Sequence, residues 1–177
     1  MPTTLPDQYY FIGSGLHTVT FTPYSQVPTG TIPEYPITYE IHEDVPLSKP
    51  AWINLINNSE ITIDTDNDAN VRSYDVTMKG TLGDYSSLTD TTDFKVHLLK
   101  LDTTPIPLFV YAFGDPTLQA YTPFTYSPSG GTIPDYQIEY TLVQQGDGVS
   151  PAPPFITLDG SGNIRVYEPN QSNVAQA

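Results

Sequence analysis

Cysteine is absent from this 177-residue chain, so disulfides, thiolate metal sites and cysteine nucleophiles are excluded. Basic residues are scarce, because 6 Lys and Arg stand against 20 Asp and Glu and leave a net charge of −14. This balance argues against nucleic acid and anionic membrane surfaces as partners, since both attract Lys and Arg. No apolar run approaches the roughly 20 residues of a membrane helix, so no membrane insertion is expected in this segment. The N-terminus also lacks the basic start and apolar block of a secretory signal.

Residues that form turns and strands are abundant instead. The chain contains 18 Pro, 12 Gly and 13 Tyr, and it is rich in Thr. Pro and Gly disfavour helices and favour turns, whereas Tyr and Thr are enriched in strands. The composition therefore predicts an all-β fold.

The chain repeats itself. Residues 30–41 recur as residues 131–142, displaced by 101 positions, and seven of the twelve positions are identical. Self-similarity at a fixed period indicates repeated structural modules. We therefore expect two tandem modules: a complete first one over residues 1–102 and a second one over residues 103–177.

Short alternating segments predict the fold of each module. Within the repeated stretch, Ile37, Tyr39 and Ile41 alternate with polar residues, as in a half-buried strand. The first module contains about seven such strands with turns between them and no amphipathic helix, which is typical of an immunoglobulin-like sandwich. The single Trp, Trp52, is expected to anchor its core, and its counterpart Phe155 is the candidate for this role in the second module.

The second module is expected to lack its last two strands. Its later part is displaced by 103 positions, so Ala177 corresponds to Tyr74, and the counterparts of residues 76–78 and 94–98 are absent. An incomplete sandwich has unpaired strand edges, which favour strand addition. We therefore expect self-association, or association with neighbouring repeats, through added β-strands. Residues 1–12 and 167–177 are the candidate donors.

A set of packing and turn residues characterises the first module: Ile37, Tyr39, Ile41, Pro50, Ala51, Trp52, Ile53, Ile61, Thr62, Ile63, Tyr74, Asp75, Val76, Thr77, Gly80, Thr81, Leu82, Phe94, Lys95 and Val96. This pattern resembles the dystroglycan-type cadherin-like repeat of extracellular and surface proteins. The resemblance implies tandem seven-stranded Greek-key sandwiches on an extracellular or cell-surface chain, with a structural or adhesive role. The Asp-rich linker motif of calcium-dependent cadherins is missing from residues 101–107, where Asp102 is the only acid.

Calcium is nevertheless the one cofactor that the sequence leaves open. Asp64, Asp66, Asp68 and Asp75 occupy positions 1, 3, 5 and 12 of a segment with the spacing of an EF-type loop. Ala69 stands at position 6, where the sharp turn needs Gly. The alternative interpretation, which we prefer, is a solvated acidic loop between strands.

Two further features concern modification and catalysis. Asn57 and Asn170 each begin an N-glycosylation acceptor pattern. The three histidines, His17, His42 and His97, lie on separate strands and are expected at the surface. We find no catalytic constellation, and so we do not expect an enzyme.

The sequence thus favours a non-enzymatic structural or adhesive module of an extracellular or cell-surface assembly. In the sharper form of this hypothesis, the chain is a filament subunit whose second sandwich is completed by strands from a neighbouring chain. The alternative is a calcium- or carbohydrate-binding accessory module.

Overall fold

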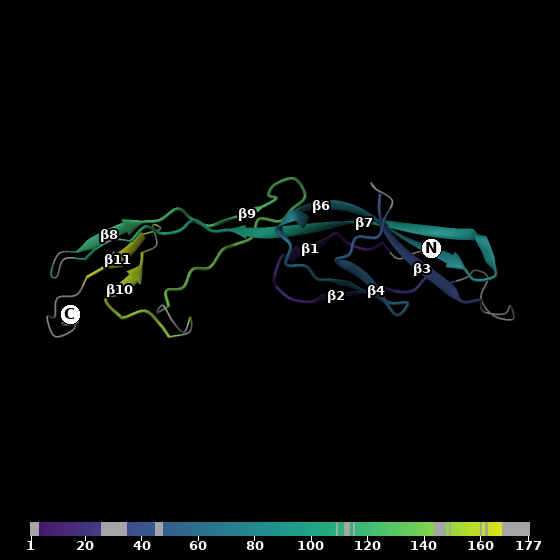
Figure 1. Cartoon of the computed structure of the whole chain (residues 1–177), viewed down its shortest axis with the longest axis horizontal. Coiled ribbons are helices and arrows are strands. Elements are labelled where there is room, and N and C mark those ends of the chain that lie inside the picture. The colour runs from purple at the N-terminus through teal and green to yellow at the C-terminus, as the bar shows by residue number, and fades with distance from the viewer. Residues whose placement is uncertain are drawn as a thin grey trace. The chain divides into compact units, whose positions relative to one another are not determined.

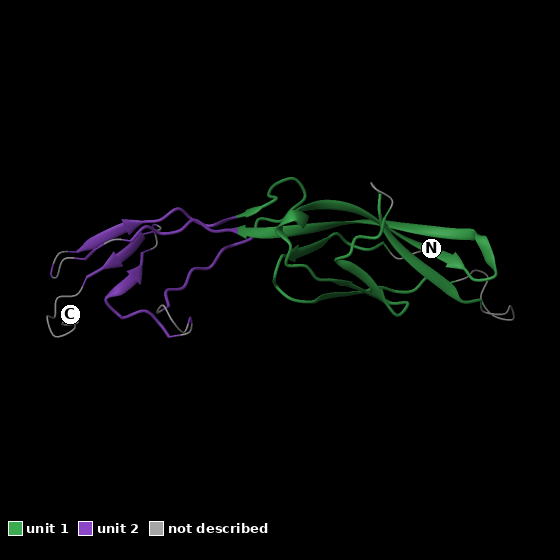
Figure 2. Cartoon of the chain, in the orientation of Figure 1, with its two compact units in different colours: residues 1–101, 126–135 green, residues 102–125, 136–177 purple. Residues whose placement is uncertain are grey.

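The computed structural model describes residues 4–25, 35–44, 48–108, 110–111, 114, 116–143, 148, 150–159, 161 and 163–167. These residues form strands and one short 3-10 helix, and none of their helices is long and apolar enough to cross a membrane. The chain divides into two compact units (Figure 2). Unit 1 comprises Met1–Leu101 with Tyr126–Asp135, and unit 2 comprises Asp102–Thr125 with Tyr136–Ala177. The proposed boundary after residue 102 stays a prediction, and the structure adds that Tyr126–Asp135 lies with unit 1.

The first sheet of unit 1 is organised around a long hairpin (Figure 1). Strands β6 (Arg72–Leu82) and β7 (Tyr85–Asp102) pair in antiparallel register and lie at its centre. On one side, β3 (Ile37–Glu43) pairs antiparallel with β6. On the other side, β1 (Gln8–Phe11) pairs parallel with β7, and β9 (Thr125–Ser127) also pairs with β7.

The second sheet of unit 1 contains β2 (His17–Thr20), β5 (Glu60–Ile63) and β4 (Ile53–Ile56) in the order β2-β5-β4. The acidic loop after β5 contains the 3-10 helix η1 (Asp68–Asn70). Seven strands in two sheets, with the third, sixth and seventh together and the second, fourth and fifth together, form an immunoglobulin-like Greek-key sandwich. The predicted fold class is thereby confirmed.

Apolar side chains from both sheets form one core in unit 1. Its buried members are Leu5, Tyr10, Phe21, Ile41, Trp52, Ile53, Ile61, Ile63, Tyr74, Val76, Met78, Phe94, Val96 and Leu98. The core residues of β6 and β7 alternate with residues outside the core, because every second residue of a strand faces the other sheet. Trp52 is buried, with its ring centroid 4.7 Å from that of Tyr74, so its predicted role as a core anchor is confirmed.

Unit 2 repeats one of the two sheets. Strands β8 (Thr117–Ala120), β11 (Asn163–Val166) and β10 (Ile156–Leu158) pair antiparallel in the order β10-β11-β8, which matches β4-β5-β2 of unit 1. Residues 138–142, the counterpart of β3, form no strand. Among the described strands of unit 1, β3 pairs with β6, and no described strand of unit 2 lies in that place beside residues 138–142.

Candidate functional site

Unit 1 contains a cavity of about 480 Å³ beside the acidic loop. Its lining consists of Glu43, Pro50, Ala51, Trp52, Asp64, Thr65, Asp66, Asn67, Asn70, Arg72 and Tyr74. The aromatic residues come from the sandwich core, whereas the carboxylates come from β3 and from the loop after β5. A cavity that combines aromatic walls with a few polar groups has the general character of a ligand site.

The Arg72 side chain contacts both the aromatic and the acidic residues that line the cavity. Its guanidinium carbon lies 4.4 Å from the centroid of the Tyr74 ring, which is a cation–π contact. Its Nη2 donates a hydrogen bond of 2.9 Å to Oε1 of Glu43. One guanidinium thus stands among three carboxylates, those of Glu43, Asp64 and Asp66. The excess of carboxylate oxygens favours a cationic or hydroxyl-rich ligand over an anionic one.

The four acids of the expected calcium loop are directed to different partners. Asp64 accepts a hydrogen bond of 3.3 Å from the Tyr10 hydroxyl, and Asp68 pairs with Lys100. Asp75 lies in strand β6 and pairs with Lys95 of β7. Asp66 lines the cavity with Asp64.

The loop itself explains why the acids diverge. The side chain of Asn67 accepts from the backbone N–H of Ala69 at 3.0 Å and caps η1, after which β6 begins at Arg72. The last position of the EF-type spacing is therefore on a strand and not on a closing helix. Over the described ranges, no group of three or more His, Cys, Asp or Glu is placed to hold a metal ion. Calcium binding stays a prediction.

Of the two glycosylation candidates, the structure describes only one. Asn57 is exposed in the turn between β4 and β5 and has a left-handed backbone with φ of 52°, a conformation that Asn adopts more readily than most residues. Asn170 lies outside the described residues. Glycosylation at both sites stays a prediction.

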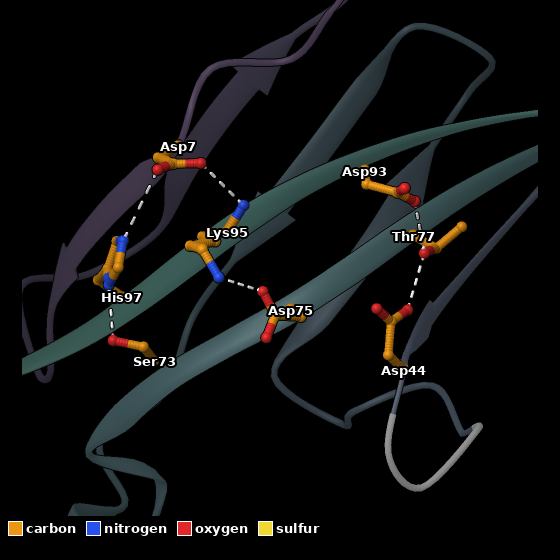
Figure 3. Close-up of polar contacts among 8 residues, drawn as sticks. All are labelled: Asp7, Asp44, Ser73, Asp75, Thr77, Asp93, Lys95 and His97. Atoms are coloured by element: carbon orange, nitrogen blue, oxygen red, sulfur yellow. Dashed lines mark hydrogen bonds and ion pairs between the residues drawn. The ribbon is translucent and has the colours of Figure 1, made fainter. Parts of the chain in front are cut away.

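A polar network lies on the face of the first sheet that points away from the core (Figure 3). Ser73 Oγ lies 2.7 Å from Nδ1 of His97, and Oδ2 of Asp7 lies 4.0 Å from Nε2 of the same ring. Oδ1 of Asp7 accepts a hydrogen bond of 3.0 Å from the backbone N–H of Lys95. The figure also shows the Lys95–Asp75 ion pair beside this group. Ser73 of β6, His97 of β7 and Asp7, which directly precedes β1, therefore lie together.

The expectation of a surface position is wrong for His97, whose relative exposure is 2%. The Tyr9 ring stacks on it, with centroids 4.8 Å apart and planes 9° from parallel, and the Tyr9 hydroxyl donates to the Thr132 carbonyl at 3.0 Å. Nε2 of His97 is buried and has no hydrogen-bond partner among the residues that the structure describes. Burial lowers the pKa of His97, with nearby Asp7 acting in the opposite direction. The Tyr9 ring thus covers the His97 ring and shields it from solvent.

A further polar contact on the same face joins three elements. The hydroxyl of Thr77 lies 2.8 Å from Oδ1 of Asp44 and 2.7 Å from Oδ1 of Asp93 (Figure 3). These residues follow β3 and belong to β6 and β7. The contact fixes the position of the chain after β3 against the central hairpin.

The second candidate site is the unpaired edge of unit 2, which we define as residues 138–142. Ile138, Tyr140 and Leu142 are half-buried and alternate with exposed Glu139 and Thr141, as in a strand. No strand in the described part of unit 2 pairs with this edge. Residues 138–142 therefore have the pattern of a strand but pair with no described strand.

Aromatic contacts hold the unpaired edge in place. The Tyr140 hydroxyl accepts a hydrogen bond of 2.8 Å from the backbone N–H of Phe124. The Tyr140 ring centroid lies 5.4 Å from that of Tyr121 and 5.5 Å from that of Phe124. The Leu142 carbonyl accepts from the backbone N–H of Ala152 at 3.1 Å. The edge is thus fixed by the side chain of Tyr140 and by one backbone hydrogen bond at Leu142, without a strand ladder.

Sequence reasoning predicted unpaired strand edges in the second module but did not name residues 138–142 as the edge. The signal was present, because Phe21, Tyr24 and Tyr39 of unit 1 recur as Tyr121, Phe124 and Tyr140 in unit 2. The offsets are 100, 100 and 101 positions, and the aromatic character is kept at each.

Comparisons with known proteins place the chain in no established family. No family model matches it, and no curated protein matches it. A crystal structure of titin domains Z1Z2 in complex with telethonin is similar over 93% of this chain and 78% of that chain, at 18% sequence identity and a TM-score of 0.39.

Proposed function

We propose that this protein is a non-enzymatic structural or adhesive module of an extracellular or cell-surface assembly. Its two immunoglobulin-like units act as a spacer of the dystroglycan-type cadherin-like kind, to which residues of both repeats bear a resemblance. Its unit 2 associates with a neighbouring molecule by β-strand addition. The chain then functions as a subunit of an extended assembly.

The unpaired edge of unit 2 is the observation that carries this proposal. A strand edge presents unpaired N–H and C=O groups, which bind an added strand through main-chain hydrogen bonds. The edge is ordered by the Tyr140–Phe124 hydrogen bond of 2.8 Å, so little additional ordering is needed when a strand arrives. The high net charge of −14 opposes nonspecific aggregation and favours a defined contact.

The donor segments require separate consideration. Gln8–Phe11 is already paired with β7 in its own unit, in the register Gln8↔Val96 to Phe11↔Leu99. To act as a donor, it would have to leave this ladder. Residues 168–177 lie outside the described residues.

Association of the complete chain tests the proposal. Sedimentation velocity and electron microscopy over a range of protein concentrations are expected to show species larger than a monomer that increase with concentration. Thr141→Pro, which disrupts strand pairing, is expected to reduce association, whereas Thr141→Ala at the same exposed position leaves it intact. A chain that stays monomeric at every concentration, with the edge protected from hydrogen exchange, would overturn it.

The cavity beside the acidic loop favours a second candidate function, the binding of calcium or carbohydrate. Asp64 and Asp66 offer carboxylate oxygens, and Trp52 and Tyr74 offer aromatic surface in the same cavity. Thermal melting with calcium and with a chelator, in the wild type, Asp66→Asn and the control Asp135→Asn, tests the calcium form. A shift in the wild type and the control but not in Asp66→Asn is the expected result. For carbohydrate, Trp52 fluorescence during sugar titration is the measurement.

A further inference from the structure

We infer that Tyr35 and Tyr85 of unit 1 form a modification site, at which oxidation of both phenols joins the two rings covalently as dityrosine. The oxidant is hydrogen peroxide acting through a haem peroxidase. The inference concerns unit 1 alone, so it does not rest on strand addition by unit 2.

The two rings meet at the tip of the central hairpin of unit 1. Tyr85 is the first residue of β7, and Tyr35 lies two residues before β3. Their ring centroids are 5.2 Å apart and their planes are 89° from parallel, so the edge of one ring faces the other. A hydrogen bond between the two side chains is the largest of the influences that raise the pKa of Tyr35. The hydroxyls are therefore adjacent, and they bring the neighbouring Cε atoms of the two rings close together.

The backbone holds the pair in this position. The N–H of Gly83 donates a hydrogen bond of 2.7 Å to the Pro36 carbonyl, which joins the residue after Tyr35 to the turn before Tyr85. A Cβ atom built on Gly83 would lie 3.0 Å from Cγ of Pro36, so the two chain segments are closely packed here. The folded backbone thus brings the two tyrosines together, although 50 positions separate them.

The pair is also accessible to an oxidant. Tyr85 has a relative exposure of 46%, and Tyr35 is half-buried. Two directly joined rings have their centroids about 4.3 Å apart, given a carbon–carbon bond of about 1.5 Å. Coupling therefore requires only a small approach of the two rings, which rotation of the exposed Tyr85 side chain provides.

The atoms and electrons of the step balance. Each phenol loses one electron and one proton and becomes a phenoxyl radical whose unpaired electron lies partly on Cε. A carbon–carbon bond forms between one Cε atom of each ring. Each of these carbons then loses its proton while the hydroxyl oxygen regains one, which restores the aromatic rings. One hydrogen peroxide takes up the two electrons and two protons and becomes two molecules of water.

Two other tyrosine pairs are built differently. The ring centroids of Tyr24 and Tyr39 lie 5.3 Å apart, and those of Tyr121 and Tyr140 lie 5.4 Å apart. The hydroxyls of Tyr24, Tyr39 and Tyr140 are hydrogen-bonded to backbone groups. Their rings are thus oriented by the backbone and not by a second phenol. These pairs serve as internal controls for the reaction.

The bond would give unit 1 a covalent link of a kind that its composition otherwise excludes. The chain contains no Cys, so no disulfide can form. A link from Tyr35 to Tyr85 closes a loop that includes β3, β4, β5 and β6. Closing a loop of this length lowers the entropy of the unfolded chain and so stabilises the folded state.

Treatment of the complete chain with peroxidase and hydrogen peroxide, followed by trypsin and mass spectrometry, tests the inference. Tyr85 is the single tyrosine of the tryptic peptide 80–95, and Tyr35 lies in the peptide 1–72. We expect these two peptides to be joined, with a mass lower than their sum by two hydrogen atoms. The link is expected in the wild type and in the control Tyr9→Phe, which alters the same peptide, and it is expected to be absent from Tyr35→Phe and Tyr85→Phe.

The yield provides a further criterion. A pair within one chain has an effective concentration in the millimolar range, so at low micromolar protein the link is expected to exceed cross-links between chains by about tenfold or more. At a urea concentration that unfolds unit 1, the share of this link in the total dityrosine is expected to fall. A link that persists in Tyr35→Phe, a share that urea leaves unchanged, or coupling mainly within the control pairs would overturn the inference.

Discussion

The hydroxyl of Tyr39 accepts a hydrogen bond of 2.7 Å from the backbone N–H of Tyr24, and the two rings meet edge to face with centroids 5.3 Å apart. Tyr140 and Phe124 make the equivalent bond of 2.8 Å in unit 2. In both units the bond ties the chain after the second strand to the third strand or its counterpart. It is present in unit 2 without the partner strands, so it is a property of the repeat itself.

Tyr39→Phe removes this hydrogen bond while keeping the ring. We expect the free energy of unfolding of unit 1 to fall by about 1–2 kcal/mol, because a part-buried backbone N–H loses its acceptor. Urea unfolding followed by the fluorescence of Trp52, the single Trp of the chain, measures the change. Tyr140→Phe is the matched control and is expected to leave the Trp52 transition unchanged. An unchanged midpoint in Tyr39→Phe would contradict the prediction.

Gly80→Val places a side chain against the Tyr24 ring. Valine is ordinarily favoured over glycine in a strand. A loss of stability in Gly80→Val would therefore show that the collision with the Tyr24 ring outweighs the strand propensity of valine. We expect a loss of about 1–3 kcal/mol, as for overpacking of a core. In the background of Tyr24→Ala the same substitution is expected to cost much less, and a double-mutant cycle measures the difference. Additive effects would show that the ring and the glycine are independent.

The sequence predicts the sheets of this fold better than its long-range contacts. The alternation of Ile37, Tyr39 and Ile41 is a local property of the strand, and the structure confirms it. The burial of His97 is not local, because it requires Tyr9, 88 positions earlier in the chain, to stack on the ring. An alternating pattern only states which face a residue points to, and it does not state what covers that face.

The acidic loop of the first candidate site shows the same limit. The EF-type spacing of Asp64, Asp66, Asp68 and Asp75 is a statement about distances along the chain. The fold directs Asp68 and Asp75 to Lys100 and Lys95 instead, and no local pattern contains that choice. By contrast, the strand-like alternation of residues 138–142 follows from the repeat, because these residues align with residues 37–41 of β3.

Asp159 organises the turn between β10 and β11. Its Oδ1 accepts from the backbone N–H groups of Ser161 and Asn163, each at 2.9 Å. The Asn163 side chain also donates to this carboxylate, and these hydrogen bonds hold the pKa of Asp159 below its ordinary value. A lowered folded-state pKa means that the stabilisation is present above the unfolded pKa of about 3.9 and is lost as the pH falls through the folded value.

Asp159→Ala is therefore expected to speed amide exchange at Ser161 and Asn163, as measured by hydrogen exchange at neutral pH. Asp159→Asn keeps one acceptor oxygen and is expected to have a smaller effect. Exchange in β6 and β7 of unit 1 serves as the internal control and is expected to stay the same. Equal exchange at Ser161 in wild type and Asp159→Ala would contradict the role of the carboxylate.

His97 gives unit 1 a pH dependence whose sign follows from its burial. The ring is packed under Tyr9, and the charged groups around it are Asp7, Lys95 and Asp75. Burial is the largest influence and lowers the pKa of His97 in the folded state, whereas the unfolded chain takes up this proton near pH 6.5. Below about pH 6.5 the unfolded state thus binds more protons, and the free energy of unfolding falls until the folded-state pKa is passed.

His97→Gln removes the titrating group. Its free energy of unfolding is expected to fall less than that of the wild type between pH 7.5 and pH 5, as measured by urea unfolding with Trp52 fluorescence at each pH. His17 and His42 are present in both proteins, so their titration cancels in the difference. Tyr9→Ala uncovers the ring while keeping the histidine. Its free energy of unfolding is also expected to fall less than that of the wild type between pH 7.5 and pH 5. Parallel pH profiles for wild type and His97→Gln would show that the buried ring does not couple folding to pH.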